Sequence, residues 1–170
     1  PSTPPPSLPK GYTLHAGIPA VPEYLHVRAS SGLRPKTASE AAPLAKGSWW
    51  GCYITYDGPK LNSQETESES SSKETTATTG PAVAMGRIIG DGGWYFLIAD
   101  MAVLPEHQRK GLGDVVLKQL LAYIKANAAD GDPFVTLLAD PPGRKLYGRN
   151  GFVDGSPALM GMHMELDWRK

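Results

Sequence analysis

The sequence has few of the features that mark secreted, disulfide-stabilised or nucleic-acid-binding proteins. One cysteine, Cys52, occurs in 170 residues, so no disulfide can form within the chain. This composition is typical of a reducing compartment. Basic and acidic residues both number 17, so no excess of positive charge favours nucleic acid or an anionic membrane surface. We therefore expect neither as a partner.

Long apolar runs are also missing. No stretch approaches the about 20 apolar residues that a helix needs to span a bilayer, and the beginning of the chain lacks the pattern of a signal peptide. The four histidines are scattered, without the spacing of metal ligands. We expect a cytoplasmic protein, with the nucleus as an alternative, that uses no metal.

Two segments have a composition that argues against a packed core. Residues 1–20 begin with PSTPPPSLP, which predicts a proline-rich N-terminal extension before one domain over 21–170. Residues 58–80 are dominated by serine, threonine and glutamate. Such a segment cannot bury enough apolar surface to offset the entropy of ordering it. We predict a flexible hairpin insertion there, whose role the sequence leaves open.

The remaining segments alternate between strand-like and helix-like patterns. The apolar and β-branched runs predict strands over 24–28, 49–57, 82–93, 94–104, 133–139 and 159–166. Helical spacing predicts helices over 39–42, 111–128 and 142–152. A short link at 91–93 favours an antiparallel hairpin between 82–93 and 94–104. This order predicts an α/β (α+β) fold with helices against a mixed sheet.

The helix over 111–128 begins in an unusual turn that contains Arg109, Lys110, Gly111 and Gly113. The first turn of a helix has free N–H groups and partial positive charge, which together bind anions. Glycine lets a bulky anion approach the backbone closely. The turn therefore predicts a phosphate-binding site, although the spacing matches neither a P-loop nor a Rossmann fingerprint. The alternative is that the glycines serve helix packing only.

Two sequence patterns resemble those of one enzyme family. The run VLPEHQRKGLG (103–113) resembles the acetyl-CoA signature Q/R-x-x-G-x-G/A of the GNAT superfamily of N-acetyltransferases, with Gln108, Gly111 and Gly113 in the defining positions. The run KLYGRNGF (145–152) resembles the family's later pattern, L-Y-x-x-x-G-F. The resemblance extends over about 24–166, apart from the insertion.

The resemblance implies a GNAT fold with about six to seven strands in a mixed, mostly antiparallel sheet. In that fold the fourth and fifth strands splay apart and acetyl-CoA binds between them. The resemblance further implies that the cofactor contacts Met101, Ala102, Val103, Gln108, Arg109, Lys110, Gly111, Leu112 and Gly113. Asp140, Lys145 and Tyr147 would add contacts. Asp140 stands where the family often has asparagine, and an ionised carboxylate cannot donate a hydrogen bond.

Two residues are candidates for catalysis. The resemblance implies that Tyr147 lies beside the cofactor sulfur, where its phenol would protonate the departing thiolate. The alternative is a tyrosine that only packs the helix. Asp100, the one carboxylate in 94–104, is a candidate general base or anchor for the acceptor amine. Its alternative role is that of a buried acid bonded to neighbouring backbone.

These observations predict an acetyl-CoA-dependent N-acetyltransferase. The acceptor would be a primary amine of a small molecule, attacking directly through a tetrahedral intermediate, and the protein would be a monomer or homodimer. One alternative within the family is a protein or peptide N-acetyltransferase. An alternative of another class is a non-catalytic acyl-CoA-binding module.

Overall fold

The computed structural model describes residues 7–58 and 80–164. The chain divides into two compact units, the first ending at Thr136 and the second beginning at Leu137, and each is described by itself. Residues 59–79, most of the predicted insertion, lie outside the described residues. None of the described helices is long and apolar enough to cross a bilayer.

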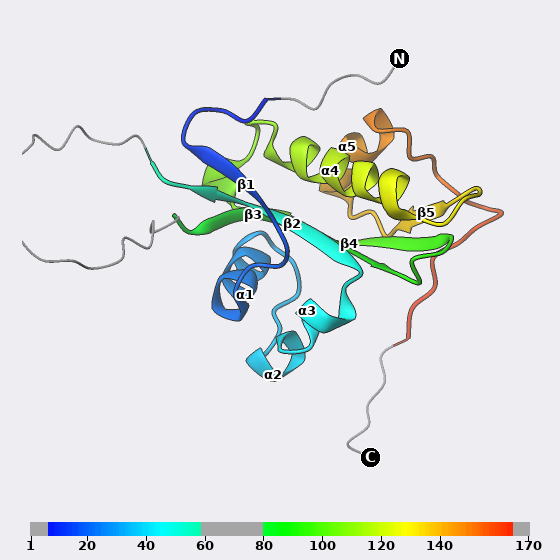
Figure 1. Ribbon diagram of the computed structural model, residues 1–170, viewed down its shortest axis with the longest axis horizontal. Coiled ribbons are helices and arrows are strands. Elements are labelled where there is room, and N and C mark those ends of the chain that lie inside the picture. The colour runs from blue at the N-terminus through cyan, green and yellow to red at the C-terminus, as the bar shows by residue number, and fades with distance from the viewer. Residues whose placement is uncertain (1–6, 59–79, 165–170) are drawn as a thin grey trace, which may run out of the picture. The chain divides into compact units, whose positions relative to one another are not determined.

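A five-stranded sheet in chain order forms the centre of the fold (Figure 1). Its strands are β1 (Tyr12–Ala16), β2 (Trp50–Tyr56), β3 (Ala82–Gly90), β4 (Tyr95–Val103) and β5 (Phe134–Leu137). The first four pair in antiparallel fashion, and β5 follows β4 in parallel. This confirms the predicted mixed, mostly antiparallel sheet, with five strands among the described residues where six to seven were expected.

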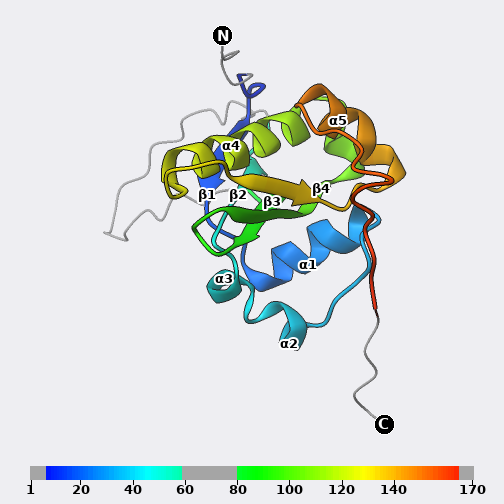
Figure 2. The ribbon, with the colours of Figure 1, turned by 90° about the vertical axis from the view of Figure 1, so that its right-hand side faces the viewer.

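Helices cover both faces of the sheet in the first unit. Figure 2 shows α1 (Val21–Ser30), α2 (Ala38–Ala41) and α3 (Leu44–Gly47) on one face and α4 (Leu112–Asn127) on the other. The predicted helix over 111–128 is therefore confirmed. The apolar stripe of α4 lies against the sheet and is buried at Leu112, Val115, Val116, Leu117, Leu120 and Ile124. This stripe is the largest contribution of any helix to the core.

The strand predicted over 24–28 is wrong, because these residues form the middle of α1. Five residues are too few to separate a strand period from a helical one: Tyr24 and Val27 are three apart, and both are buried on one side of the helix. The first strand is instead β1, which lies within residues 1–20 and pairs with β2 through Leu14 and Ile54. Residues 12–16 thus belong to the sheet.

The second unit contains a short 3₁₀ turn, η2 (Pro141–Gly143), followed by α5 (Arg144–Arg149). These elements confirm the helix predicted over 142–152. The strand predicted over 159–166 is wrong for residues 159–164, which form no strand, and residues 165 and 166 lie outside the described residues. Apolar alternation favours a strand only when a neighbouring strand pairs with the backbone, and the sequence of the segment cannot supply that information.

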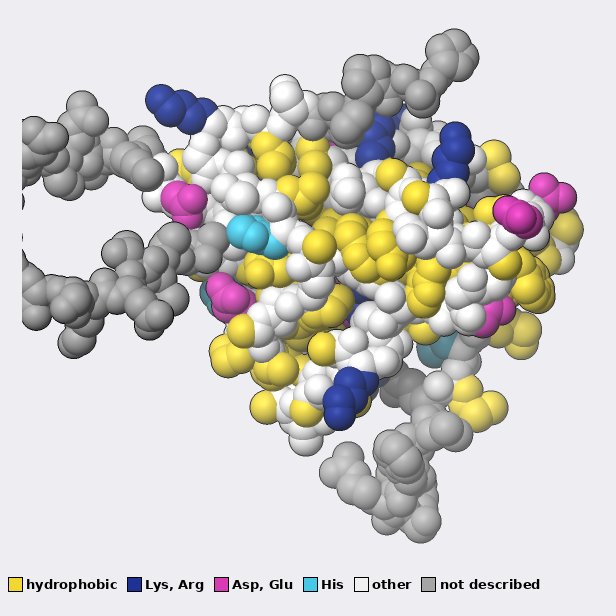
Figure 3. All heavy atoms as spheres, viewed as in Figure 1, with side chains coloured by type: hydrophobic (Ala, Val, Ile, Leu, Met, Phe, Trp, Pro, Cys, Tyr) yellow, Lys and Arg dark blue, Asp and Glu magenta, His cyan; other side chains and the backbone are white. Residues whose placement is uncertain are grey.

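Both signs of charge occur on the surface that Figure 3 presents. Some acidic side chains of the described residues lie next to one another near the right edge of the view, but neither sign covers a large part of this face. The view agrees with the formal net charge of zero for the whole sequence. No net charge of the whole chain therefore favours an anionic or a cationic partner.

Candidate active site

The glycine turn, residues 108–113, leads directly into α4. Gly111 is the residue before the helix and has a left-handed backbone with φ of 82°, and Arg109 also has a positive φ of 59°. No side chain caps the helix. The N–H groups of Asp114 and Val115 donate to the Gly111 carbonyl. The N–H groups of Leu112 and Gly113 have no acceptor within the helix, so these two groups can bind an anion.

Side chains connect the glycine turn to two strands of the sheet. The Gln108 amide donates to the carbonyl of Val103 at the end of β4, with an N···O distance of 3.1 Å. Lys110 Nζ donates to the carbonyl of Glu106 at 2.9 Å and to the hydroxyl of Tyr12 at 3.2 Å. Both of these acceptors are neutral, so neither bond compensates the positive charge of Lys110.

Tyr12 and His107 flank the turn, and sequence reasoning missed the contact between them. The Tyr12 hydroxyl lies 2.8 Å from His107 Nδ1, and the rings of Tyr12 and Tyr56 have centroids 4.5 Å apart. Burial lowers the pKa of His107, and the charge of Lys110 lowers it further. His107 is therefore held as a neutral ring at neutral pH. Tyr12 is in the segment predicted as an extension, so no pattern pointed to this contact.

A β-bulge interrupts the ladder between β3 and β4. Arg87 pairs with Ala99 and Met85 pairs with Ala102, so two residues, Asp100 and Met101, stand opposite Gly86 alone. Asp100 has a φ of 54°, a conformation that costs energy for any residue except glycine. Bulges of this kind redirect side chains, and this one determines the direction of the Asp100 carboxylate.

Gly86 is required opposite the bulge because the neighbouring side chains fill the space. A Cβ on Gly86 would lie 2.6 Å from Met101 Sδ and 2.8 Å from Val116 Cγ1 of α4. Met101 thus packs on the side of the sheet that α4 covers. Asp100 contacts residues of α1, on the opposite side. Met101 and Asp100 thus lie on opposite faces of the sheet, as successive residues of a strand do.

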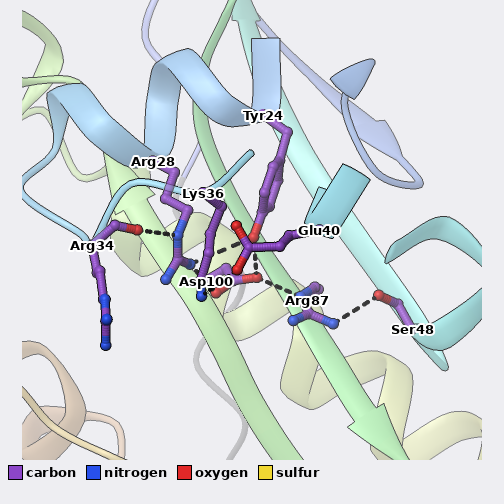
Figure 4. Close-up of polar contacts among 8 residues, drawn as sticks. All are labelled: Tyr24, Arg28, Arg34, Lys36, Glu40, Ser48, Arg87 and Asp100. Atoms are coloured by element: carbon purple, nitrogen blue, oxygen red, sulfur yellow. Dashed lines mark hydrogen bonds and ion pairs between the residues drawn. The ribbon is translucent and has the colours of Figure 1, made fainter. Parts of the chain in front are cut away.

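Four side chains meet between α1 and the sheet (Figure 4). We call them the Asp100 cluster, and they are Tyr24, Arg28, Arg87 and Asp100. Asp100 Oδ2 accepts from the Tyr24 hydroxyl at 2.7 Å and from Arg87 Nε at 2.5 Å, and Oδ1 accepts from Arg28 Nη1 at 2.5 Å. The charged side chains are only 11–14% exposed. Three hydrogen bonds from two elements thus fix this carboxylate.

The cluster holds Asp100 in its ionised form. Burial raises the pKa of Asp100, but the hydrogen bonds from Tyr24 and Arg87 and the charges of both arginines outweigh this effect, so the pKa lies below its ordinary value. Burial raises the pKa of Tyr24, and its bond to Asp100 raises it further. The sequence identified Asp100 but none of its three partners, because they come from distant positions in the chain.

The second unit holds the remaining predicted residues, Asp140, Lys145 and Tyr147. Asp140 precedes η2 and its carbonyl accepts from the Gly143 N–H at 2.9 Å; Lys145 and Tyr147 lie on α5. A Cβ on Gly143 would lie 2.8 Å from the Tyr147 ring. Burial raises the pKa of Tyr147, and the negative charge of Asp140 raises it further. The phenol therefore keeps its proton at neutral pH.

The structure thus brings the predicted residues together in two groups. The first unit contains Met101, Ala102, Val103, Asp100 and the glycine turn, and the second contains Asp140, Lys145 and Tyr147. Cys52 is fully buried, with its pKa raised by burial to about 12, which leaves it without a reactive thiolate at neutral pH. Among the described residues, no group of histidine, cysteine or carboxylate side chains could hold a metal ion.

Comparisons with known proteins agree with this geometry. A family model described as an acetyltransferase (GNAT) domain matches residues 75–154. A probable acetyltransferase from meticillin-resistant Staphylococcus aureus has a similar structure, with a TM-score of 0.73 and 27% identity, covering 91% of this chain and 99% of that one. A GNAT-family acetyltransferase from Streptococcus pneumoniae has a TM-score of 0.63 and 19% identity, covering 92% and 98%.

A third similar structure comes from a plant. Glucosamine-6-phosphate N-acetyltransferase from Arabidopsis thaliana has a TM-score of 0.56 and 14% identity, covering 92% of this chain and 99% of that one; at this identity the likeness concerns the fold. No curated protein matches the chain. The sequence pattern, the fold and the family match agree, and residues 75–154 match an acetyltransferase (GNAT) domain.

Proposed function

We propose that this protein transfers the acetyl group of acetyl-CoA to a primary amine of a small molecule. The observation that carries the proposal is the glycine turn: an uncapped helix start, a left-handed glycine and an uncompensated Lys110 form a phosphate-binding geometry at the end of β4. These residues fit the pyrophosphate of acetyl-CoA. The backbone of Met101, Ala102 and Val103 would pair with its pantetheine amides.

Acetyl-CoA would supply an activated thioester, and the amine nitrogen would attack its carbonyl directly through a tetrahedral intermediate. The attacking nitrogen would lose one proton to solvent, and the leaving sulfur would take one proton from the chain, so the overall transfer releases no net proton. Tyr147 is the proposed acid, because its raised pKa keeps the phenol protonated at neutral pH. A thiol has a reference pKa of about 8.5 and a phenol about 10. A phenol can therefore protonate a developing thiolate only when the two groups are held in contact.

Asp100 is proposed as an anchor on the acceptor side and not as the general base. Its lowered pKa keeps it ionised, and a carboxylate so strongly stabilised has little tendency to take a proton at neutral pH. Two arginines and a tyrosine already donate hydrogen bonds to its carboxylate oxygens. It would therefore act on the acceptor through the arginines that it positions.

The direct test of the proposed activity is amine-dependent release of CoA thiol. Purified protein is incubated with acetyl-CoA and a panel of primary amines, the free thiol is measured, and the product is identified by mass spectrometry. The proposal predicts release that requires an amine, together with an N-acetylated product. Stabilisation of the protein by acetyl-CoA without amine-dependent release would instead identify the alternative, a non-catalytic acyl-CoA-binding module.

A further inference from the structure

The Asp100 cluster contains more positive than negative charge. One carboxylate is shared by the guanidinium groups of Arg28 and Arg87, each bonded to it at 2.5 Å, and Tyr24 is kept neutral by its raised pKa. The cluster therefore has a formal charge of +1. Its charged side chains are mostly buried, and an excess charge in such a place is costly unless a counter-charge reaches it.

Nearby acids on the same face of the sheet are bonded elsewhere. Glu40 of α2 pairs with Lys36 at 3.0 Å and accepts from the backbone N–H of Thr37. Glu23 of α1 accepts from the N–H of Ala82 at 3.1 Å. Neither of these bonds involves the Asp100 cluster, so the interactions made by these two acids leave its excess charge in place.

The two arginines also have donors to spare. A guanidinium has five N–H groups in a planar fork. Arg28 uses Nε for the backbone carbonyl of Arg34 and Nη1 for the Asp100 cluster, and Arg87 uses Nε for Asp100 and Nη1 for the hydroxyl of Ser48. Within the part of the chain that the structure describes, no hydrogen bond reaches Nη2 of either residue. Figure 4 shows the Arg34 side chain pointing away from Asp100.

The Asp100 cluster lies next to the part of β4 that is proposed to bind the cofactor. Asp100 directly precedes Met101, Ala102 and Val103 in β4, the backbone proposed to pair with the pantetheine. A strand rises about 3.3 Å per residue, so Asp100 lies within about 10 Å, along the strand, of the backbone proposed to pair with the pantetheine. An amine that reacts there would hold its other substituents within reach of Arg28 and Arg87.

We propose that the acceptor amine carries an anionic group, a carboxylate or a phosphate, which binds to the free donors of Arg28 and Arg87. This inference rests on the proposed acetyltransferase function and narrows its substrate class. The anion would neutralise the excess charge of the Asp100 cluster. The same charge disfavours a protonated amine nearby, which helps to maintain the neutral nitrogen that acetyl transfer requires.

The proposal is tested first on the unchanged protein, with pairs of acceptors that differ only in the anion. Alanine is compared with alaninamide, and O-phosphoethanolamine with ethanolamine, so the two pairs separate a carboxylate from a phosphate. We expect kcat/KM, expressed per neutral amine, to be roughly tenfold or more higher for the anionic member of one pair. Equal values, or higher values for the neutral members, would overturn the proposal while leaving the acetyltransferase function intact.

Variants of Arg28 and Arg87 test whether these two residues cause the preference for an anionic acceptor. Arg28→Lys and Arg87→Lys keep the charge beside Asp100 but remove the planar fork. We expect each to raise KM severalfold more for the anionic acceptor than for its neutral counterpart, so that the ratio of the two kcat/KM values falls. Lys125→Gln, on the opposite face of the sheet, is the control for net charge. It should change KM for neither the anionic nor the neutral acceptor. A preference that both lysine variants retain in full would contradict the assignment.

A binding measurement covers the case in which no member of the panel is acetylated. The melting temperature is measured with CoA and N-acetylalanine, and again with CoA and N-acetylalaninamide. We expect N-acetylalanine, which has the carboxylate, to raise the melting temperature beyond the value with CoA alone, and N-acetylalaninamide to give no such increase. Equal increases with the two compounds would overturn the proposal. Failure of acetyl-CoA binding, on which the proposed function depends, is recognised separately as the absence of any shift with acetyl-CoA.

Discussion

Arg87 of β3 and Asp100 of β4 form an ion pair at the one irregularity in the ladder between these strands. The Nε···Oδ2 distance is 2.5 Å, and the register shifts at the same point. The pair therefore joins two strands where the regular backbone pairing is interrupted. Asp100 also has a positive φ, so the ion pair offsets part of the cost of an unfavourable backbone.

Asp100→Asn should destabilise the protein more than Arg87→Gln. The asparagine variant leaves two positive charges facing each other, whereas the glutamine variant leaves Asp100 paired with Arg28. Each hydrogen bond to a charged group contributes about 1.5–3 kcal/mol, so we expect Asp100→Asn to lose at least that much free energy of unfolding. Urea denaturation measures both, and the reverse order would contradict the described charge distribution.

Lys36→Gln is the matched control for this comparison. Lys36 and Glu40 also form an ion pair on the same face of the sheet, but their side chains are exposed to solvent. Surface pairs contribute little to stability. The urea midpoint of Lys36→Gln should therefore equal that of the parent within error.

The contribution of Asp100 to stability should depend on acid pH. Its pKa is lower in the folded protein than the unfolded value of about 3.9. Its stabilising effect is then complete above the unfolded pKa and is lost as pH falls through the folded pKa. The difference in unfolding free energy between the parent and Asp100→Asn should shrink from about pH 5 to about pH 2. A difference that stays constant over this range would contradict the prediction.

Two glycine substitutions should change stability in opposite directions. Gly111 has a φ of 82° and Gly148, in α5, has no positive φ; a Cβ at either position would meet no other atom within 4 Å. Gly111→Ala should therefore lose roughly 1–2 kcal/mol through backbone strain alone. Gly148→Ala should gain about 0.5–1 kcal/mol, because glycine is a poor helix former. Thermal unfolding measures both, and a neutral Gly111→Ala would argue against the left-handed turn.

Tyr147→Phe tests the proposed acid. The substitution keeps the ring beside Gly143 but removes the proton. We expect kcat to fall by roughly 10²–10⁴, the usual contribution of a general acid, with acetyl-CoA affinity and melting temperature nearly unchanged. Tyr123→Phe, on α4 where the ring stacks on Trp50, is the control and should retain full activity. A Tyr147→Phe rate within about threefold of the parent, with chemistry rate-limiting, would exclude the role.

The local patterns that were predicted correctly are long or chemically specific. The four-residue spacing of Val116, Leu120 and Ile124 defined α4, because a buried stripe of this length has one interpretation. The short link at 91–93 predicted the β3–β4 hairpin, where Asp91 accepts from the N–H groups of Gly93, Trp94 and Tyr95. Such features depend on neighbours in the chain and can be read from sequence.

The features that were missed depend on contacts between distant residues. Tyr24 and Arg28 reach Asp100 across more than 70 positions, and nothing near Asp100 in the sequence indicates them. Tyr12 reaches His107 across 95 positions. The strand expected over 24–28 failed for the same reason, since burial against the sheet decides between helix and strand in so short a segment. The uncapped start of α4 after Gly111 could be predicted because it depends on neighbouring residues in the chain, and its role in binding phosphate stays a prediction.

The most direct test of the account compares amine-dependent CoA release by the parent and by Gly113→Val. A branched side chain at this position would keep a phosphate from the N–H groups that begin α4. We expect N-acetylated product from the parent, and loss of both turnover and acetyl-CoA stabilisation in a folded Gly113→Val. Gly47→Val in α3 is the control, because a Cβ at Gly47 would meet no atom of another element within 4 Å, and it should retain normal activity. Normal turnover by Gly113→Val, or no amine-dependent release by the parent, would contradict the account.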